Sequence, residues 1–187
     1  MNPKPAIAFD LDDTLHDLTG AFLDFHLKTY GYTIPLESAP FFVGTALGIS
    51  DEEEDRRWDK FFKDPSSLDI PAFEDARTTI EELKKSHRVV LMTDRSRNWI
   101  PHAKAWIEGH LKGVFDDLVF VKELSEAKDK AVICKEMNIA VLIDDKPSTI
   151  EQCDAYGVKG IFFDRPWNRG LTFAPRVYRL SELGELL

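Results

Sequence analysis

Five short apolar runs recur along the chain, and stretches with helical periodicity separate most of them. The runs are residues 6–9, 89–93, 118–121, 141–143 and 160–163. Apolar side chains at helical spacing occur in residues 73–85 and 99–111, and a further helix-like stretch covers residues 148–156. Strands that alternate with helices of this length form a parallel sheet whose two faces are both covered. We therefore predict an α/β fold with a parallel sheet of about five strands and helices on both faces.

Residues 16–70 interrupt this alternation. They contain two helix-like pieces, near 20–30 and 51–62, and no convincing strand. The second piece follows Ser50 and Glu53, which have the spacing of a capping box. A helical segment placed directly after the first strand predicts a cap over the sheet. The expected division is a core of residues 1–15 and 71–187 and a helical cap of residues 16–70.

Charge and composition exclude several classes of partner. The formal net charge of -9 argues against a surface that follows the phosphates of a nucleic-acid polymer. No apolar run approaches the ~20 residues of a membrane span, and the first residues do not read as a signal peptide. The two cysteines, Cys134 and Cys153, lack a metal-ligand spacing and read as reduced, partly buried thiols. We expect a cytoplasmic protein without a membrane partner.

Carboxylates gather where the predicted strands end. Asp10 and Asp12 follow the first run, and Asp144 and Asp145 follow the fourth. Because ligands bind beyond the carboxyl ends of parallel strands, these remote clusters should meet in space. An oxygen-rich set without cysteine or histidine suits Mg2+ better than Zn2+. The sequence therefore predicts a magnesium site at this edge of the sheet.

Four motifs in order carry a resemblance to a known family. FDLDDT, VVLMTD, a lysine near 130 and LIDD resemble the motifs of the haloacid-dehalogenase-like (HAD) phosphatases. VLMTDR, WIPHAKAWIEGHL, KDKAVI, LIDDKP and FFDRPWN are further similar to the 5'-nucleotidase (deoxyribonucleotidase) branch, as is PFFVG in the cap. The resemblance implies the HAD fold, which is Rossmann-like, and a Mg2+-dependent phosphoric monoester hydrolase.

The resemblance also implies roles for the strand-end carboxylates. Asp10 would be the nucleophile that forms an aspartyl-phosphate, and Asp12 the general acid and base. Mg2+ would be held by Asp10, by the backbone carbonyl of Asp12 and by Asp144, with Asp145 close by or acting through water. Asp13 is expected to be a turn residue, because the family accepts several residue types at that position.

Phosphate binding is implied for the second and third motifs. The Thr93 hydroxyl and the backbone N–H of Asp94 would donate to phosphate oxygens, and Lys130 would add a positive charge. Lys128 competes with Lys130 for this role, and KDKAVI favours Lys130.

Substrate recognition is expected from the cap aromatics and from one arginine. Phe41, Phe42 and Val43 are candidates for contact with the substrate, with packing inside the cap as the alternative. Arg95 would touch substrate or lie at the surface. The five histidines have no ligand spacing, so packing or surface roles are expected for them.

The expected function is hydrolysis of nucleoside 5'-monophosphates, with deoxyribonucleotides favoured by the resemblance. One alternative is another small phosphoester or a nucleic-acid 3'-phosphate, the last disfavoured by the negative charge. A second alternative is a phospho-switch receiver, a binding module that would have no use for Asp12 or for a cap. The expected partner is a small phosphate monoester, and a homodimer is left open.

Overall fold

The computed structural model describes residues 4–187, and within them six strands form a single parallel sheet in the order β3-β2-β1-β4-β5-β6. The strands are β1 (Ala6–Phe9), β2 (Arg88–Thr93), β3 (Asp117–Phe120), β4 (Ile139–Asp144), β5 (Lys159–Phe163) and β6 (Arg176–Val177). The first five match the five predicted runs to within two residues. A strand of two residues at the sheet edge has no periodicity, so β6 was not predicted.

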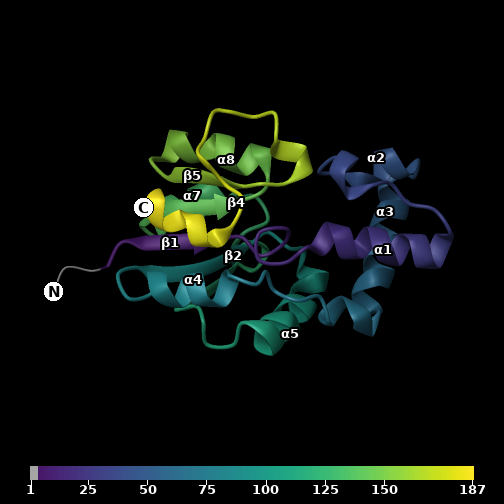
Figure 1. Cartoon of the computed structure of the whole chain (residues 1–187), viewed down its shortest axis with the longest axis horizontal. Coiled ribbons are helices and arrows are strands. Elements are labelled where there is room, and N and C mark those ends of the chain that lie inside the picture. Colours follow the sequence, from purple (N-terminus) through teal and green to yellow (C-terminus); the bar gives the residue numbers. More distant parts are fainter. Residues whose placement is uncertain (1–3) are drawn as a thin grey trace.

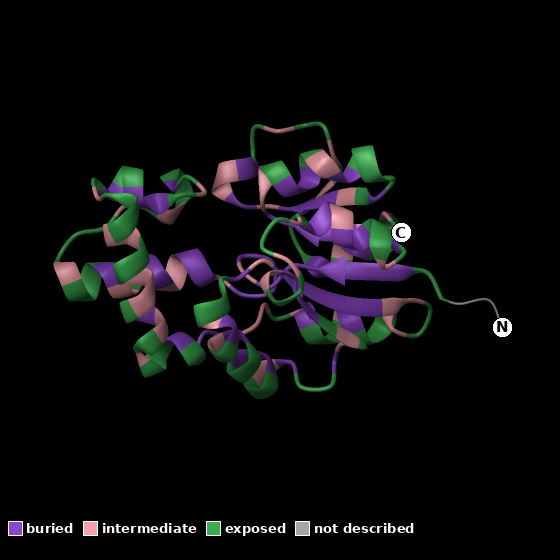
Figure 2. Cartoon of the chain, turned by 180° about the vertical axis from the view of Figure 1, so that it is seen from behind, coloured by how far each residue is buried: buried purple, intermediate pink, exposed green. Residues whose placement is uncertain are grey.

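Alternation along the strands divides the core into two layers. In β1, Ile7 and Phe9 belong to one buried cluster, whereas Ala6 and Ala8 belong to the other. Successive side chains of a strand point to opposite faces, so each cluster fills one face. Figure 2 shows the strands buried between their covering helices. The helices are α4 (Ala76–Leu83) and α5 (Ile100–His110) on the first face and α7 (Lys130–Glu136) and α8 (Pro147–Cys153) on the second.

Three helices beside this sheet belong to the segment inserted after β1 (Figure 1). They are α1 (Leu18–Tyr30), α2 (Val43–Leu47) and α3 (Asp51–Lys63). Their buried side chains form a separate hydrophobic cluster, whose fully buried members all lie between residues 18 and 70. The Ser50 side chain accepts a hydrogen bond from the Glu53 N–H at 3.3 Å and so begins α3, as its spacing predicted. This separate cluster supports the proposed cap of residues 16–70.

Short helical elements differ most from the expectation. α2, α6 (Val121–Leu124) and α7 are four to seven residues long, too short for a periodicity to identify. α8 ends at Cys153, and a 3-10 turn continues from Asp154 to Tyr156.

Cys134 and Cys153 are buried and free of disulfides. Within residues 4–187, no helix combines the length and the apolar character that crossing a membrane requires.

The order of the strands reverses between β1 and β4. β1 pairs with β2 on one side and with β4 on the other, so the chain turns back at this central junction. The N–H of Asp10 donates to the carbonyl of Ile143 at 2.9 Å, which sets the ends of the two strands side by side. In open parallel sheets such a switch point is the place where ligands bind.

Candidate active site

Three buried carboxylates meet at the switch point. Asp10 follows β1, Asp144 is the last residue of β4, and Asp145 comes next. One oxygen from each carboxylate lies within 4.8 Å of the others, and all three residues are buried. The structure thus brings Asp10, Asp144 and Asp145 together as expected but leaves the Asp12 side chain out of the group, and metal binding by these residues stays a prediction. Charges this close repel strongly in a medium of low dielectric constant.

Lys130 partly offsets this repulsion. Its Nζ lies 2.5 Å from Asp10 Oδ1 and 2.7 Å from Asp144 Oδ2, and the side chain is buried. Lys128, the competing candidate, instead pairs with Glu136 at 2.6 Å on the surface. Lys130, at the N-terminus of α7, is therefore the lysine that the fold delivers to the carboxylates.

One lysine does not neutralise three carboxylates, and the pKa values of Asp10 and Asp145 reflect the deficit. Burial raises the pKa of Asp10 to about 7, although the Lys130 charge opposes the shift. Burial and the neighbouring carboxylates Asp144 and Asp10 raise the pKa of Asp145 well above its usual range. A buried all-oxygen donor set short of positive charge is the environment that a hard divalent cation fits. The residues present therefore fit Mg2+.

Hydrogen bonds from neighbouring residues hold two of these carboxylates in place. The Trp167 Nε1–H donates to Asp145 Oδ2 at 2.9 Å, and Asn168 Nδ2 donates to the Asp145 carbonyl at 2.8 Å. The Lys146 N–H donates to Asp144 Oδ1 at 2.8 Å. Partners of this kind orient metal ligands and tune their basicity.

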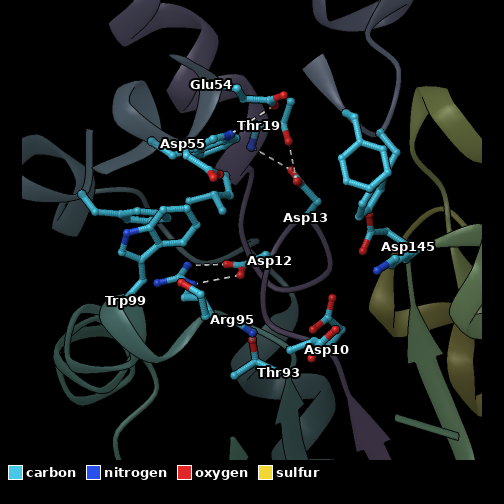
Figure 3. A pocket seen from close by; sticks show the side chains of 18 of the residues that line it. Asp10, Asp12, Asp13, Thr19, Glu54, Asp55, Thr93, Arg95, Trp99 and Asp145 are labelled. Carbon is cyan, nitrogen blue, oxygen red and sulfur yellow. Dashed lines mark hydrogen bonds and ion pairs between the residues drawn. The ribbon is translucent and has the colours of Figure 1, made fainter. Parts of the chain in front are cut away.

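The Asp12 side chain lies outside the carboxylate group and faces Arg95 (Figure 3). Arg95 Nε donates to Asp12 Oδ2 at 3.0 Å, and Arg95 Nη2 donates to Oδ1. His16 Nε2 lies 3.0 Å from the same Oδ1. Burial alone would raise the pKa of Asp12, but Arg95 and His16 outweigh it and hold that pKa well below its usual range. Metal binding through the Asp12 backbone carbonyl stays a prediction.

Arg95 is buried and is therefore not the surface arginine that one of the two expectations described, while its contact with substrate stays a prediction. Its side chain is only 2% exposed, and the guanidinium is committed to Asp12. The sequence could not show this pairing, because the two residues are 83 positions apart. Arg95 lines the cavity as part of the Asp12 environment.

Thr93, Asp94 and Lys130 line the same cavity as Asp10, as the phosphate-binding expectation requires. Thr93 ends β2, and its Oγ1 accepts the Arg95 N–H at 3.2 Å. The Asp94 side chain pairs with Lys122 at 3.1 Å. The fold thus collects the expected phosphate ligands, while their contact with phosphate stays a prediction.

Asp13 is a turn residue with a structural task. It adopts a φ of 57°, a left-handed conformation that aspartate tolerates better than most residues. Its Oδ1 accepts the Thr19 N–H at 3.0 Å and its Oδ2 accepts the Thr19 hydroxyl at 2.6 Å. Arg165 adds a third donor at 3.1 Å. Asp13 therefore anchors the first turn of α1 at the entrance to the cap.

A cavity of about 680 Å3 lies between the strand ends and the cap. Figure 3 shows Asp10 and Thr93 near one end of it, and Glu54 and Asp55 of α3 on the far side. The remaining wall is aromatic and polar cap surface, together with residues that follow β2. Its aromatic members are Phe41, Phe42, Trp58, Phe62 and Trp99.

The three cap candidates separate into two groups. Phe42 is 69% exposed and lines the cavity, and Phe41 lines it with its ring edge-on to Trp167 at 6.1 Å. Val43 is 1% exposed and belongs to the hydrophobic cluster of the cap. The expectation of substrate contact for Val43 is therefore corrected: α2 begins at Val43 and turns this side chain inward.

Three residues of this site were not identified as site residues from the sequence. His16 contacts Asp12, His102 contacts Arg95, and Trp167 contacts Asp145. The histidines have no ligand spacing because they bind protein groups rather than a metal. Trp167 does lie in FFDRPWN, one of the stretches that carry the family resemblance, and this membership is the sequence signal that could have identified it.

Comparisons with known proteins agree with this architecture. A family model described as "5' nucleotidase, deoxy (Pyrimidine), cytosolic type C protein" matches residues 4–187. A protein of Oceanobacillus iheyensis named "Putative nucleotidase OB0422" is 20% identical over 174 residues, which cover 90% of this chain and 92% of that protein.

Solved structures of similar fold come from two further bacteria. The haloacid dehalogenase-like hydrolase SP0104 of Streptococcus pneumoniae has a TM-score of 0.72 at 17% identity, covering 100% of this chain and 99% of the other. The HAD-hydrolase YfnB of Bacillus subtilis, described as bound to magnesium, has a TM-score of 0.67 at 13% identity, covering 100% and 99%. These structures share the fold of this chain.

Proposed function

Because this chain belongs to the family of cytosolic type C 5'-nucleotidases and is a phosphoric monoester hydrolase of the HAD superfamily, we propose that it hydrolyses nucleoside 5'-monophosphates in a Mg2+-dependent reaction. Deoxyribonucleotides are the favoured substrates, in line with the description of the family. The observation that carries the proposal is a cavity lined both by Asp10 and Lys130 and by aromatic side chains. An aspartyl-phosphate on Asp10 is the proposed intermediate.

In the first step, an Asp10 carboxylate oxygen attacks phosphorus and the bond from phosphorus to the ester oxygen breaks. Asp12 must first take up a proton from solvent, because its pKa lies well below its usual range in the free site. It then gives that proton to the departing oxygen, since an alkoxide is a poor leaving group. Lys130 lies against Asp10, where its charge favours both the ionised nucleophile and the approaching phosphate. Thr93 donates its hydroxyl to a phosphate oxygen.

In the second step, a water molecule attacks the phosphorus of the aspartyl-phosphate. Asp12, now a carboxylate, accepts the proton of that water, and the bond from phosphorus to Asp10 breaks. Inorganic phosphate leaves and Asp10 is regenerated. Mg2+ bound by Asp10, Asp144 and Asp145 would neutralise charge on the phosphate and the nucleophile.

The charges around the cavity favour a single phosphate group. Of the cationic residues that line the cavity, Lys130 is paired with two aspartates, Arg95 is paired with Asp12, and Lys146 lies over the Phe41 ring at 5.3 Å. The cap contributes Asp51, Glu54 and Asp55 to the cavity wall. A second phosphate would face these carboxylates, so the arrangement supports monophosphates over diphosphates.

Truncating Phe42 is expected to weaken nucleotide hydrolysis selectively. A nucleobase can stack on an aromatic ring, a contact worth ~1–3 kcal/mol per base, or roughly 5- to 150-fold in kcat/KM. Phe42→Ala should therefore lower kcat/KM for the preferred nucleotide by that factor and affect para-nitrophenyl phosphate less. Steady-state kinetics on both substrates measures the difference.

Phe42 is well suited to this test because it is 69% exposed, so its loss removes little packing. Val43→Ala is the matched control, since the neighbouring side chain packs inside the cap. Val43→Ala should lower the melting temperature without changing the ratio between the two substrates. Equal losses on both substrates for Phe42→Ala would show that the ring does not select the base.

A phosphate-release screen tests the proposal as a whole. All ribo- and deoxyribonucleoside 5'-monophosphates are compared with the corresponding diphosphates, each with and without Mg2+. We expect Mg2+-dependent release from monophosphates and little from diphosphates. Release from sugar or glycerol phosphates but from no nucleotide would overturn the substrate assignment while leaving the phosphatase family intact.

A further inference from the structure

The Asp12 carboxylate is held by more hydrogen bonds than a freely rotating general acid would have. Its Oδ1 accepts from Arg95 Nη2 and from His16 Nε2, and its Oδ2 accepts from Arg95 Nε. An ionised carboxylate oxygen can only accept, so the His16 Nε2 carries the donated proton. His16 itself is fixed by packing against Trp106, with ring centroids 4.2 Å apart.

Counting acceptor positions identifies the oxygen that remains free. A carboxylate offers about four lone-pair positions, about two on each oxygen. The two donors on Oδ1 fill that oxygen, whereas Oδ2 has a single donor among the described residues. The Asp12 side chain is 24% exposed and lines the cavity, so this remaining position is accessible from it.

We propose that Arg95 is a positioning residue. It holds the Asp12 carboxylate in an orientation in which Oδ2 is the oxygen that exchanges protons with the substrate and with water. The inference rests on the proposed acid and base role of Asp12 and assigns a task to a residue outside the reacting atoms. In the first step, a proton that Oδ2 takes up from solvent when the substrate binds moves to the ester oxygen as the bond from that oxygen to phosphorus breaks. In the second, a water proton moves to Oδ2 as the water oxygen bonds to phosphorus.

Contacts from the cap hold Arg95 in this orientation. The Phe62 ring of α3 covers the guanidinium at 4.7 Å, a cation–π contact. Arg95 Nη1 donates to His102 Nδ1 at 2.9 Å, and His102 Nε2 donates to Ser67 Oγ at 2.8 Å. Ser67 lies in the 3-10 turn Pro65–Leu68, at the end of the cap segment.

The same contacts show that His102 is neutral. Arginine has no acceptor atom, so Nδ1 must be the acceptor and Nε2 must carry the proton. Burial and the adjacent Arg95 charge also lower the pKa of His102 to about 4. The chain of hydrogen bonds from Ser67 to Asp12 therefore stays intact across the neutral pH range.

Substrates whose leaving groups differ in basicity distinguish a positioning role of Arg95 from a general structural effect of its loss. Glycerol phosphate and nucleotides release an alkoxide that needs a proton, whereas para-nitrophenyl phosphate releases a phenolate that does not. kcat/KM reports the steps up to departure of the leaving group. Arg95→Met should therefore lower kcat/KM on the alkyl esters by ~10²–10⁴-fold, the usual range for proton transfer, and on the aryl ester by less than ~10-fold.

Hydrolysis of the aspartyl-phosphate, the second step, provides an independent test of the role of Arg95 with the aryl ester as substrate. Loss of positioning slows the attack of water, so the aspartyl-phosphate accumulates. Arg95→Met should then show a burst of about one nitrophenolate per enzyme in stopped flow, followed by slow turnover. A purely structural defect would lower the active fraction and give no such burst.

Two further variants serve as controls for misfolding and for effects unrelated to Asp12. Arg95→Lys keeps the charge but loses the planar fork, so we expect an intermediate loss with the same preference for alkyl esters. Arg97→Met removes an exposed arginine paired with Glu126 and should match the parent in every measurement. Thermal melting of each variant verifies the fold.

A double variant decides whether Arg95 acts through Asp12. If it does, Asp12→Asn combined with Arg95→Met should lose no more activity than Asp12→Asn alone. Additive losses, equal losses on both ester types without a burst, or a rise in KM alone would each overturn the proposal. An enzyme active on glycerol phosphate but on no nucleotide would overturn only the nucleotide assignment, because the comparison on glycerol phosphate still tests Arg95.

Discussion

Asp10→Asn is expected to abolish turnover, with kcat reduced by at least ~10⁴-fold, the scale seen when a covalent nucleophile is removed. The amide is a poor nucleophile, so no aspartyl-phosphate forms at this position. Phosphate release from para-nitrophenyl phosphate measures the loss, because that substrate needs only the phosphate end of the cavity. Trapping of phosphoenzyme by acid quench should succeed with the parent and fail with the variant.

The fold of Asp10→Asn should be retained, and its stability gives a second test. Burial raises the pKa of Asp10 in the folded protein to about 7, above its ordinary value of 3.8. A carboxyl with a raised pKa costs stability as pH rises from its unfolded value through its folded value. Without metal at pH 8, Asp10→Asn should therefore melt no lower than the parent.

Lys130 also keeps Asp144 as a partner in that variant, at 2.7 Å. Asp154→Asn, a change at an exposed residue, controls for differences between preparations and should retain parental activity. Near-parental hydrolysis by Asp10→Asn would contradict covalent catalysis by this residue.

Removal of metal is expected to have the next largest effect. Excess chelator should lower phosphatase activity by roughly 10³-fold, since a bound cation supplies several kcal/mol of charge stabilisation. Added Mg2+ should restore the activity. Full activity in excess chelator would contradict the magnesium site.

Mg2+ should also stabilise the fold, which gives a readout independent of activity. Saturation at 100 times Kd adds ~2.7 kcal/mol. For a domain of this size that corresponds to a rise of about 5–10 °C in Tm. Asp144→Ala removes one of the three converging carboxylates, so it should abolish most of this shift and raise the Mg2+ concentration needed for activity. An undiminished shift in Asp144→Ala would place the cation elsewhere.

The sheet and its strand-end residues could be predicted because both depend on local patterns. Each apolar run was long enough to show buried strand character, and parallel topology then brought Asp10 and Asp144 together at the switch point. The sequence also favoured Lys130 over Lys128, and the pairings of the two lysines agree with that choice.

The surroundings of Asp12 and the cap surface could not be predicted in the same way. The Arg95–Asp12 pairing depends on how β1 and β2 lie side by side, which no local pattern encodes. Phe42 and Val43 are adjacent, and the residue at which α2 begins decides which of them faces the cavity. The residue at which a helix of only five residues begins depends on tertiary packing.

The separate hydrophobic cluster of the cap has a consequence for how such a chain can diverge. Because its buried side chains pack mainly with one another, substitutions there can reshape the far wall of the cavity without disturbing the faces of the sheet. Two cap positions are less free, since Phe62 and Ser67 contact Arg95 and His102. A lineage adapting to a new leaving group could therefore vary the outer cap widely while these two positions stay tied to the Arg95–Asp12 pair.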